Sequence, residues 1–251
     1  MTVRLRGALL AGIALAVTVL FILYLRQSRS VTVGSDGGSI ALQAWDTLHG
    51  NFLLHGWAMS DVSFYPTELP QYALLEWIRG LSPDVVHVGG AMTYTIVLLL
   101  AALVAMGKPA RRGPRDRWGL RGLRGLRGGA HGERAVRAAI TAGIMLAPAP
   151  GDGSSTLLLT PDHLGSTVPV LLVWLAVDRC RPRWYVPVAV GILLAWGLVA
   201  DPLLEVTGVA PLVLVCAVRA AQRLHPKNPK NPKNPEDPAS WNNVAVFARQ
   251  G

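Results

Sequence analysis

The chain alternates uncharged apolar runs with loops whose charge changes sign from one loop to the next. Residues 7–25 form a run of 19 residues without a charge, and residues 85–106 form a run of 22 interrupted only by His87. A helix needs roughly 20 apolar residues to cross the hydrocarbon core of a bilayer. In hydrocarbon, only helices and closed barrels satisfy all their backbone polar groups. Runs of this length therefore predict membrane-spanning helices.

Four shorter apolar segments follow the second run. The third predicted span is broken early by Pro148 and Pro150. The sequence predicts an all-α polytopic membrane bundle of about six transmembrane helices, at residues 7–25, 85–106, 138–149, 164–177, 184–200 and 202–218.

The loop charges predict how this bundle is oriented. Residues 30–84 carry six acids and one base, whereas residues 107–137 carry ten bases and two acids. Residues 150–163 contain no Lys or Arg, and residues 178–183 contain three arginines. Because Lys and Arg gather in cytoplasmic loops, we expect a multi-pass protein of the cell membrane with both termini cytoplasmic. Arg26 and Arg29, at the outer end of the first span, are the exception.

The composition limits the partners of the chain. Hydrophobic residues make up 51% and charged residues 16%, against roughly 25% charged in a typical soluble domain. The net charge of +9 lies mainly between the apolar runs, without the interleaved aromatic residues of a base-stacking surface. We therefore expect the bilayer as partner, with anionic lipid headgroups at the basic loop 107–137, and no nucleic acid.

The same pattern divides the chain into a transmembrane domain and a tail. Residues 1–223 comprise the spans, the outer loop 26–84 and the cytoplasmic loop 107–137. Residues 224–251 contain a Pro-Lys-Asn repeat and are predicted to be a flexible, low-complexity cytoplasmic tail.

The outer loop 26–84 is too long for a simple connector. Residues 39–48 and 69–78 have helical spacing of apolar residues, and the loop is rich in Trp and Tyr. Short amphipathic helices on the outer membrane surface are therefore predicted. They would act as a cap facing a substrate, as interfacial anchors, or as both.

Acidic residues of this loop are candidates for chemistry. Asp36 is flanked by glycines, which let a ligand approach the backbone closely, so it is a candidate general base or metal ligand; a simple turn is the alternative. Asp61 and Glu68 flank an aromatic segment and could bind a sugar ring or a divalent ion, or cap local structure.

Asp162 and His163 lie at the outer start of the fourth span. They would cap a helix or bind the anionic part of a lipid-linked substrate. The spacing of His49 and His55 matches no zinc motif, and no metal site is predicted there. No nucleotide-binding motif is present.

A first span, the Gly34–Gly37 sequence Gly-Ser-Asp-Gly, a long aromatic outer loop and the segment from Ser60 to Tyr72 follow one another in this order. This arrangement resembles the start of the GT-C superfamily of polytopic glycosyltransferases, which includes the dolichyl-phosphate-mannose mannosyltransferases and their bacterial relatives. The resemblance implies a polyprenyl-phosphate sugar as donor, and a first-loop acid acting at the acceptor or at a divalent metal.

Carried onto this chain, the resemblance makes Asp36 the catalytic residue, the acidic side chain of the first outer loop. Asp61 and Glu68 match a second acidic position, and His163, with Asp162 beside it, matches a polar residue that contacts the donor phosphate. Members of the superfamily usually have about nine or more spans, against six predicted here. The alternative hypothesis is therefore a non-catalytic membrane subunit or scaffold, a truncated or inactive relative that binds partners or anionic lipid.

Overall fold

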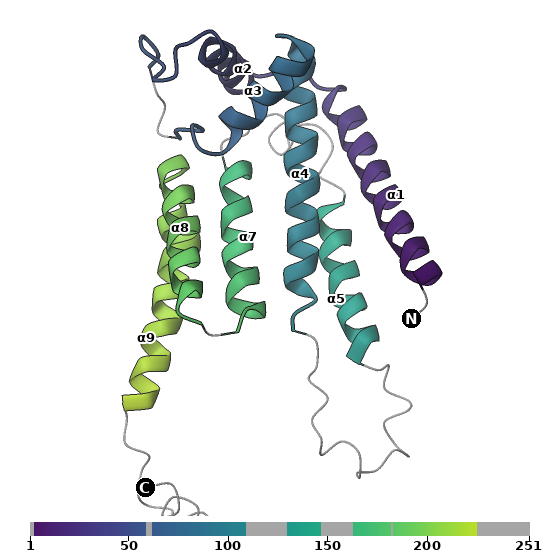
Figure 1. The fold of residues 1–251 in the computed structure, drawn as a ribbon, viewed down its shortest axis with the longest axis vertical. Coiled ribbons are helices and arrows are strands. Elements are labelled where there is room, and N and C mark those ends of the chain that lie inside the picture. Colours follow the sequence, from purple (N-terminus) through teal and green to yellow (C-terminus); the bar gives the residue numbers. More distant parts are fainter. Residues whose placement is uncertain (1–2, 59–61, 109–129, 147–162, 182, 225–251) are drawn as a thin grey trace, which may run out of the picture. The chain divides into compact units, whose positions relative to one another are not determined.

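The computed structural model describes residues 3–58, 62–108, 130–146, 163–181 and 183–224, and every regular element within these ranges is helical (Figure 1). The prediction of an all-α chain is confirmed for these residues. Met1–Gly208 forms one compact unit and Val209–Gly251 a second. Of the second unit, the structure describes one helix, α9 (Ala210–Leu224).

Two of the described helices, α1 (Val3–Ser28) and α4 (Pro83–Ala105), are long and apolar enough to cross a membrane. Both helices meet this criterion by length and composition alone. An N-terminal signal sequence and the core helix of a soluble protein meet it too. The two helices differ in burial: 6% of the most apolar window of α1 is buried, against 44% for α4.

The other apolar segments form shorter helices. α5 (Ala130–Met145), α7 (Leu164–Arg179) and α8 (Tyr185–Ala200) have 16 residues each. At 1.5 Å per residue, each helix is about 24 Å long, less than the roughly 30 Å of a bilayer core. The six predicted spans therefore stay a prediction.

Two element boundaries differ from the sequence-based expectation. α5 begins at Ala130, within the predicted cytoplasmic loop. Its first turns are polar and carry Glu133 and Arg137, so the search for apolar runs did not include them in the predicted span. The predicted span 202–218 is two elements: the π-helix η2 (Glu205–Val209) and then α9. Hydropathy alone does not report such a change of helical geometry.

Within the first unit, α4 packs against α1, α3, α5 and α7, and α7 packs against α8. Against α1, the rings of Tyr24 and Tyr94 meet edge to face with centroids 4.7 Å apart. Ser28 Oγ lies 3.0 Å from His87 Nδ1. His87, the one polar interruption near the start of the second apolar run, therefore joins two helices.

Charged groups from neighbouring elements contact both ends of α4. At its N-terminus, Asp84 accepts hydrogen bonds from Nε (2.7 Å) and Nη2 (2.9 Å) of Arg29 and pairs with Arg79 at 3.0 Å. At its C-terminus, Arg134 donates to the carbonyls of Met106 and Gly107 at 3.0 and 3.2 Å. The Asp84 carboxylate at the N-terminus and the Arg134 guanidinium at the C-terminus each match the helix dipole.

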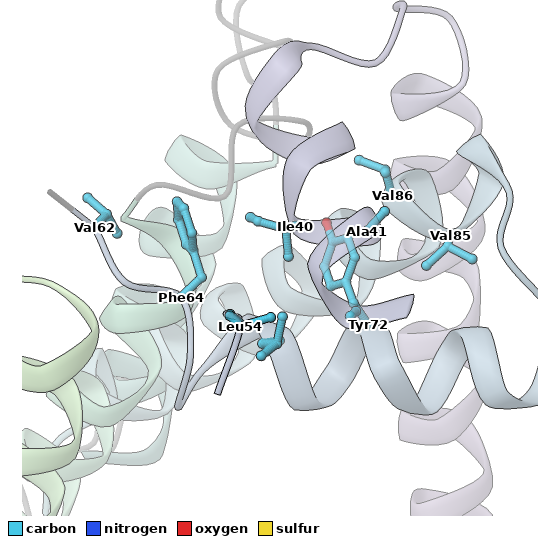
Figure 2. Close-up of a cluster of buried hydrophobic side chains, with 10 residues drawn as sticks. Ile40, Ala41, Leu54, Val62, Phe64, Tyr72, Val85 and Val86 are labelled. Atoms are coloured by element: carbon cyan, nitrogen blue, oxygen red, sulfur yellow. The ribbon is translucent and has the colours of Figure 1, made fainter. Parts of the chain in front are cut away.

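The predicted outer loop contains two helices, α2 (Ser35–Leu48) and α3 (Glu68–Arg79), which confirms both helical segments. They pack on each other and on the N-terminal part of α4. Figure 2 shows the ring of Tyr72, which is 2% exposed, directed toward Ile40 and Ala41. We call α2, α3 and the described residues between them the cap. Its core, completed by two residues of α4, consists of Ile40, Ala41, Ala44, Leu54, Val62, Phe64, Leu69, Tyr72, Val85 and Val86.

Asp46, near the end of α2, organises the turn that follows it. Its carboxylate accepts hydrogen bonds from Trp57 Nε1 (2.9 Å) and Asn51 Nδ2 (2.5 Å). The hydrogen bond from Trp57 has the larger effect and that from Asn51 the smaller; together they hold the pKa of Asp46 below its usual value, against the opposing effect of burial. His49 Nδ1 lies 2.7 Å from the carbonyl oxygen of Trp45, so these side chains have local structural partners.

The packing of Tyr72 on Gly89 provides a test of the cap. A Cβ atom at Gly89 would lie 2.7 Å from Cε2 of the buried ring. Glycine to alanine in a helix ordinarily stabilises by up to about 1 kcal/mol, but overpacking of a core costs about 1–3 kcal/mol. We therefore expect Gly89→Ala to lower the midpoint of thermal unfolding in detergent.

Gly191→Ala in α8 is the matched control, because a Cβ atom there meets nothing within 4 Å. Its midpoint should stay the same or rise. Equal midpoints for the two variants would contradict the packing of Tyr72 against α4.

Candidate functional site

The predicted site residues fall in different surroundings. Asp36 lies in the first turn of α2, exposed to solvent, and its one polar partner in the described chain is Ser35 Oγ at 3.2 Å. Asp61 and Asp162 lie outside the described residues. Glu68 and His163, from segments almost a hundred residues apart, both lie at the N-terminus of α7. The structure therefore brings together two of the five predicted residues.

Glu68 joins the outer cap to α7. Its side chain is 3% exposed, and its Oε1 accepts a hydrogen bond of 2.8 Å from the backbone N–H of Gly165. The Thr67 hydroxyl donates to its Oε2. A Cβ atom at Gly165 would overlap this carboxylate, so the close approach requires glycine. Glu68 thus satisfies one of the free N–H groups in the first turn of a helix.

The environment of Glu68 changes its acidity. Burial raises the pKa of this carboxyl from 4.5 to about 7, against the opposing hydrogen bonds from Thr67 and Gly165, and the charge of Asp201 adds to the rise. A group with such a pKa both takes up and releases a proton near neutral pH.

A second carboxylate, Asp201, holds His163 in a defined orientation. Asp201 follows α8 and is 1% exposed. Its Oδ2 lies 2.7 Å from His163 Nδ1 and 2.9 Å from Ser166 Oγ, and its Oδ1 accepts the Leu203 N–H at 2.9 Å. Burial acts to raise the pKa of Asp201, but these hydrogen bonds hold it below its usual value. The ionised Asp201 therefore accepts the Nδ1 proton of His163 and leaves Nε2 available.

A cavity of about 110 Å³ lies beside these residues. Thr67 and Gly165, the two hydrogen-bond donors to Glu68, contribute to its wall. Gln71 donates to the Gly89 carbonyl at 3.1 Å and accepts from Thr93 at 2.9 Å. The full lining consists of Thr67, Gln71, Thr93, Ile96, Gly165, Val168, Pro169 and Trp196.

The cavity wall is held by contacts between distant segments. Trp196 Nε1 donates to the Pro66 carbonyl at 2.6 Å, and Ser63 N donates to the Ala200 carbonyl at 2.9 Å. The segment that precedes α3 is therefore attached to the end of α8. Residues from α3, α4, α7 and α8 form one wall only in the folded chain.

A further buried carboxyl, Glu76, lies two turns after Glu68 on the same face of α3. It is 1% exposed, and neither of its oxygens has a hydrogen-bond partner among the described residues. Burial raises its pKa from 4.5 to about 7. Tyr72 lies between the two acids along the helix, and burial, then the charges of Glu68 and Glu76, raise its pKa well above the usual value.

Sequence reasoning missed Asp201, Ser166 and Glu76. Asp201 had one detectable signal, since it is the one charged residue between two apolar segments. Ser166 and Glu76 had none, because a single serine or glutamate on a helix is usually a surface residue. Over the described ranges, no three side chains of His, Cys, Asp or Glu converge as metal ligands.

The buried acids predict a dependence of stability on pH. Because the pKa of Glu76 is higher in the folded chain than its ordinary value, the folded state is favoured at low pH and loses this advantage as the pH rises from 4.5 to about 7. We expect Glu76→Gln to reduce the fall in thermal midpoint between pH 5 and pH 8, measured in detergent.

The control is Glu133→Gln on α5, where the side chain is 64% exposed and forms an i, i+4 pair with Arg137. This variant should keep the pH dependence of the unmodified chain. An unchanged pH dependence in Glu76→Gln would show that this carboxyl is not buried as described.

We compared the chain with known proteins in three ways. Neither the protein-family models, nor the curated proteins, nor the solved structures contain a match to the chain. The interpretation of the site therefore depends on its geometry and on the resemblance in the sequence.

Proposed function

We propose that this chain is a multi-span membrane protein of the GT-C glycosyltransferase type. It binds the sugar end of a polyprenyl-phosphate sugar at the cavity between α3, α4, α7 and α8, and transfers the sugar to a hydroxyl acceptor outside the cytoplasm. The observation that carries this proposal is the buried Glu68 carboxyl, with a pKa of about 7, against the wall of the cavity.

The proposal assigns the general base to Glu68 rather than to Asp36. A base works best when its pKa lies near the working pH, and the pKa of Glu68 is about 7. Thr67 lines the cavity and donates to Glu68, so its hydroxyl connects the carboxyl to a bound acceptor. Asp36 is exposed and has only its neighbour Ser35 as partner.

In the proposed reaction, the acceptor oxygen forms a bond to the anomeric carbon of the sugar. The bond between that carbon and the phosphate oxygen breaks, and polyprenyl phosphate leaves with the electron pair. The acceptor proton passes through the Thr67 hydroxyl to Glu68. His163 is oriented through Nδ1 by Asp201, and in its doubly protonated form it donates Nε2–H to the donor phosphate.

The second candidate function is a non-catalytic membrane subunit that binds a partner or anionic lipid. The size of the cavity favours it, since about 110 Å³ is below the roughly 300–1,000 Å³ of typical small-molecule sites. A cavity of this volume accommodates part of a sugar ring, so the rest of a lipid-linked donor would lie outside it.

The test is sugar transfer by the full-length protein in liposomes supplied with radiolabelled polyprenyl-phosphate hexose. If Glu68 is the base, Glu68→Gln should lower the release of polyprenyl phosphate by about 10²–10⁴-fold, while Asp36→Ala and the exposed control Glu133→Gln should stay within about twofold of the unmodified protein.

The reverse pattern, with activity lost in Asp36→Ala and kept in Glu68→Gln, would return the base to Asp36. Absence of release by the unmodified protein, with every polyprenyl-phosphate hexose and acceptor tried, would favour the non-catalytic subunit.

A further inference from the structure

α3 lies across the ends of the apolar helices. Its first residue, Glu68, bonds the first turn of α7, and its last residue, Arg79, pairs with Asp84 in the first turn of α4. Arg29, directly after the apolar helix α1, pairs with the same Asp84. Figure 1 shows α2 and α3 at the end of the first unit where α4 begins. If α1 and α4 cross a membrane, α3 lies at the level of the headgroups.

The two faces of α3 differ in burial in a way that fits this position. Leu69, Tyr72 and Glu76 are buried against the cap and α4. The opposite face carries large apolar side chains that no other part of the described chain covers: Leu74 is 54% exposed, Trp77 75% and Ile78 66%. An amphipathic helix at headgroup level buries such a face about 5–10 Å into the boundary between headgroups and acyl chains.

Basic side chains gather at the same place. Arg29 and Arg79 share the single carboxylate of Asp84 and remain about half exposed. Arg26, one turn before Arg29, is exposed and has no polar partner within the described ranges. Arg29 and Arg79 therefore share one carboxylate, and Arg26 adds a third positive charge one helical turn away, so two of the three positive charges are uncompensated. A phosphate group complements such a surplus, because arginine binds phosphate through several N–H donors.

We propose that Arg26, Arg29 and Arg79 bind the phosphate of an anionic phospholipid while Trp77 and Ile78 insert beside its acyl chains. The site lies in the leaflet that contains the end of α1 and the start of α4. It uses neither Glu68 nor the cavity, so it is independent of sugar transfer. It also gives a role to Arg26 and Arg29 at the predicted outer end of α1, which the distribution of charge between the loops does not explain.

Insertion of α3 is tested by site-directed spin labelling of the full-length protein in liposomes. Cys180 and Cys216 are first replaced by serine, and Trp77→Cys is labelled with a nitroxide. The label should collide more with membrane-dissolved oxygen than with a water-soluble nickel chelate. Ser39→Cys, on the exposed polar part of α2, is the control and should show the reverse. Equal preference for the nickel chelate at both positions would overturn the insertion.

Phosphate binding is tested by retention of phosphatidylglycerol in native mass spectrometry, with phosphatidylcholine as the neutral lipid. Arg26→Gln/Arg79→Gln leaves the Arg29–Asp84 pair in place and should weaken phosphatidylglycerol binding about thirtyfold. Arg111→Gln/Arg112→Gln, which removes the same charge from the basic loop 107–137, should keep the site. Equal loss in the two variants would indicate general charge attraction and overturn the site, as would equal displacement of the lipid by inorganic phosphate.

Discussion

The two ends of α4 meet charged side chains from other elements, and the first unit is arranged around these contacts. Asp84 is the one Asp, Glu, Lys or Arg of α4, so the arginines at its two ends come from other elements. Arg29 and Arg79 reach Asp84 at one end, and Arg134 reaches the last carbonyls at the other. These links position α1, α3 and α5 around α4, and α7 packs on its remaining side.

The start of α7 is likewise held by a side chain from another element. The first turn of α7 has free N–H groups that its own residues leave unsatisfied. Glu68 supplies the acceptor for Gly165, and its burial there is what brings its pKa to about 7. The carboxyl that attaches the cap to α7 is therefore also one of two, with Glu76, whose pKa burial brings near neutrality, and of these two it is the one whose hydrogen-bond partners line the cavity.

Much of the fold could be predicted because helix formation and apolar length are local properties. The helices at residues 3–28, 83–105, 164–179 and 185–200 follow from uncharged runs, and α2 and α3 follow from helical spacing of apolar residues. The site was harder to predict. Asp36 was predicted from its flanking glycines, and it lies exposed in the first turn of α2, whose N-cap is Gly34. Glu68 was a candidate because it flanks an aromatic segment, whereas Asp201 was not predicted; the burial of both side chains is visible only in the structure.

The sequence alone determined that the described residues are helical, about where the two long apolar helices lie, and which loops are acidic or basic, because these properties depend on neighbouring residues. Only the tertiary structure decided that Glu68 meets Gly165, that Asp201 holds His163, and that Glu76 loses its water. These contacts join segments up to 97 residues apart or depend on which face of a helix is covered. A residue's own neighbours along the chain contain no information on the desolvation that such packing produces.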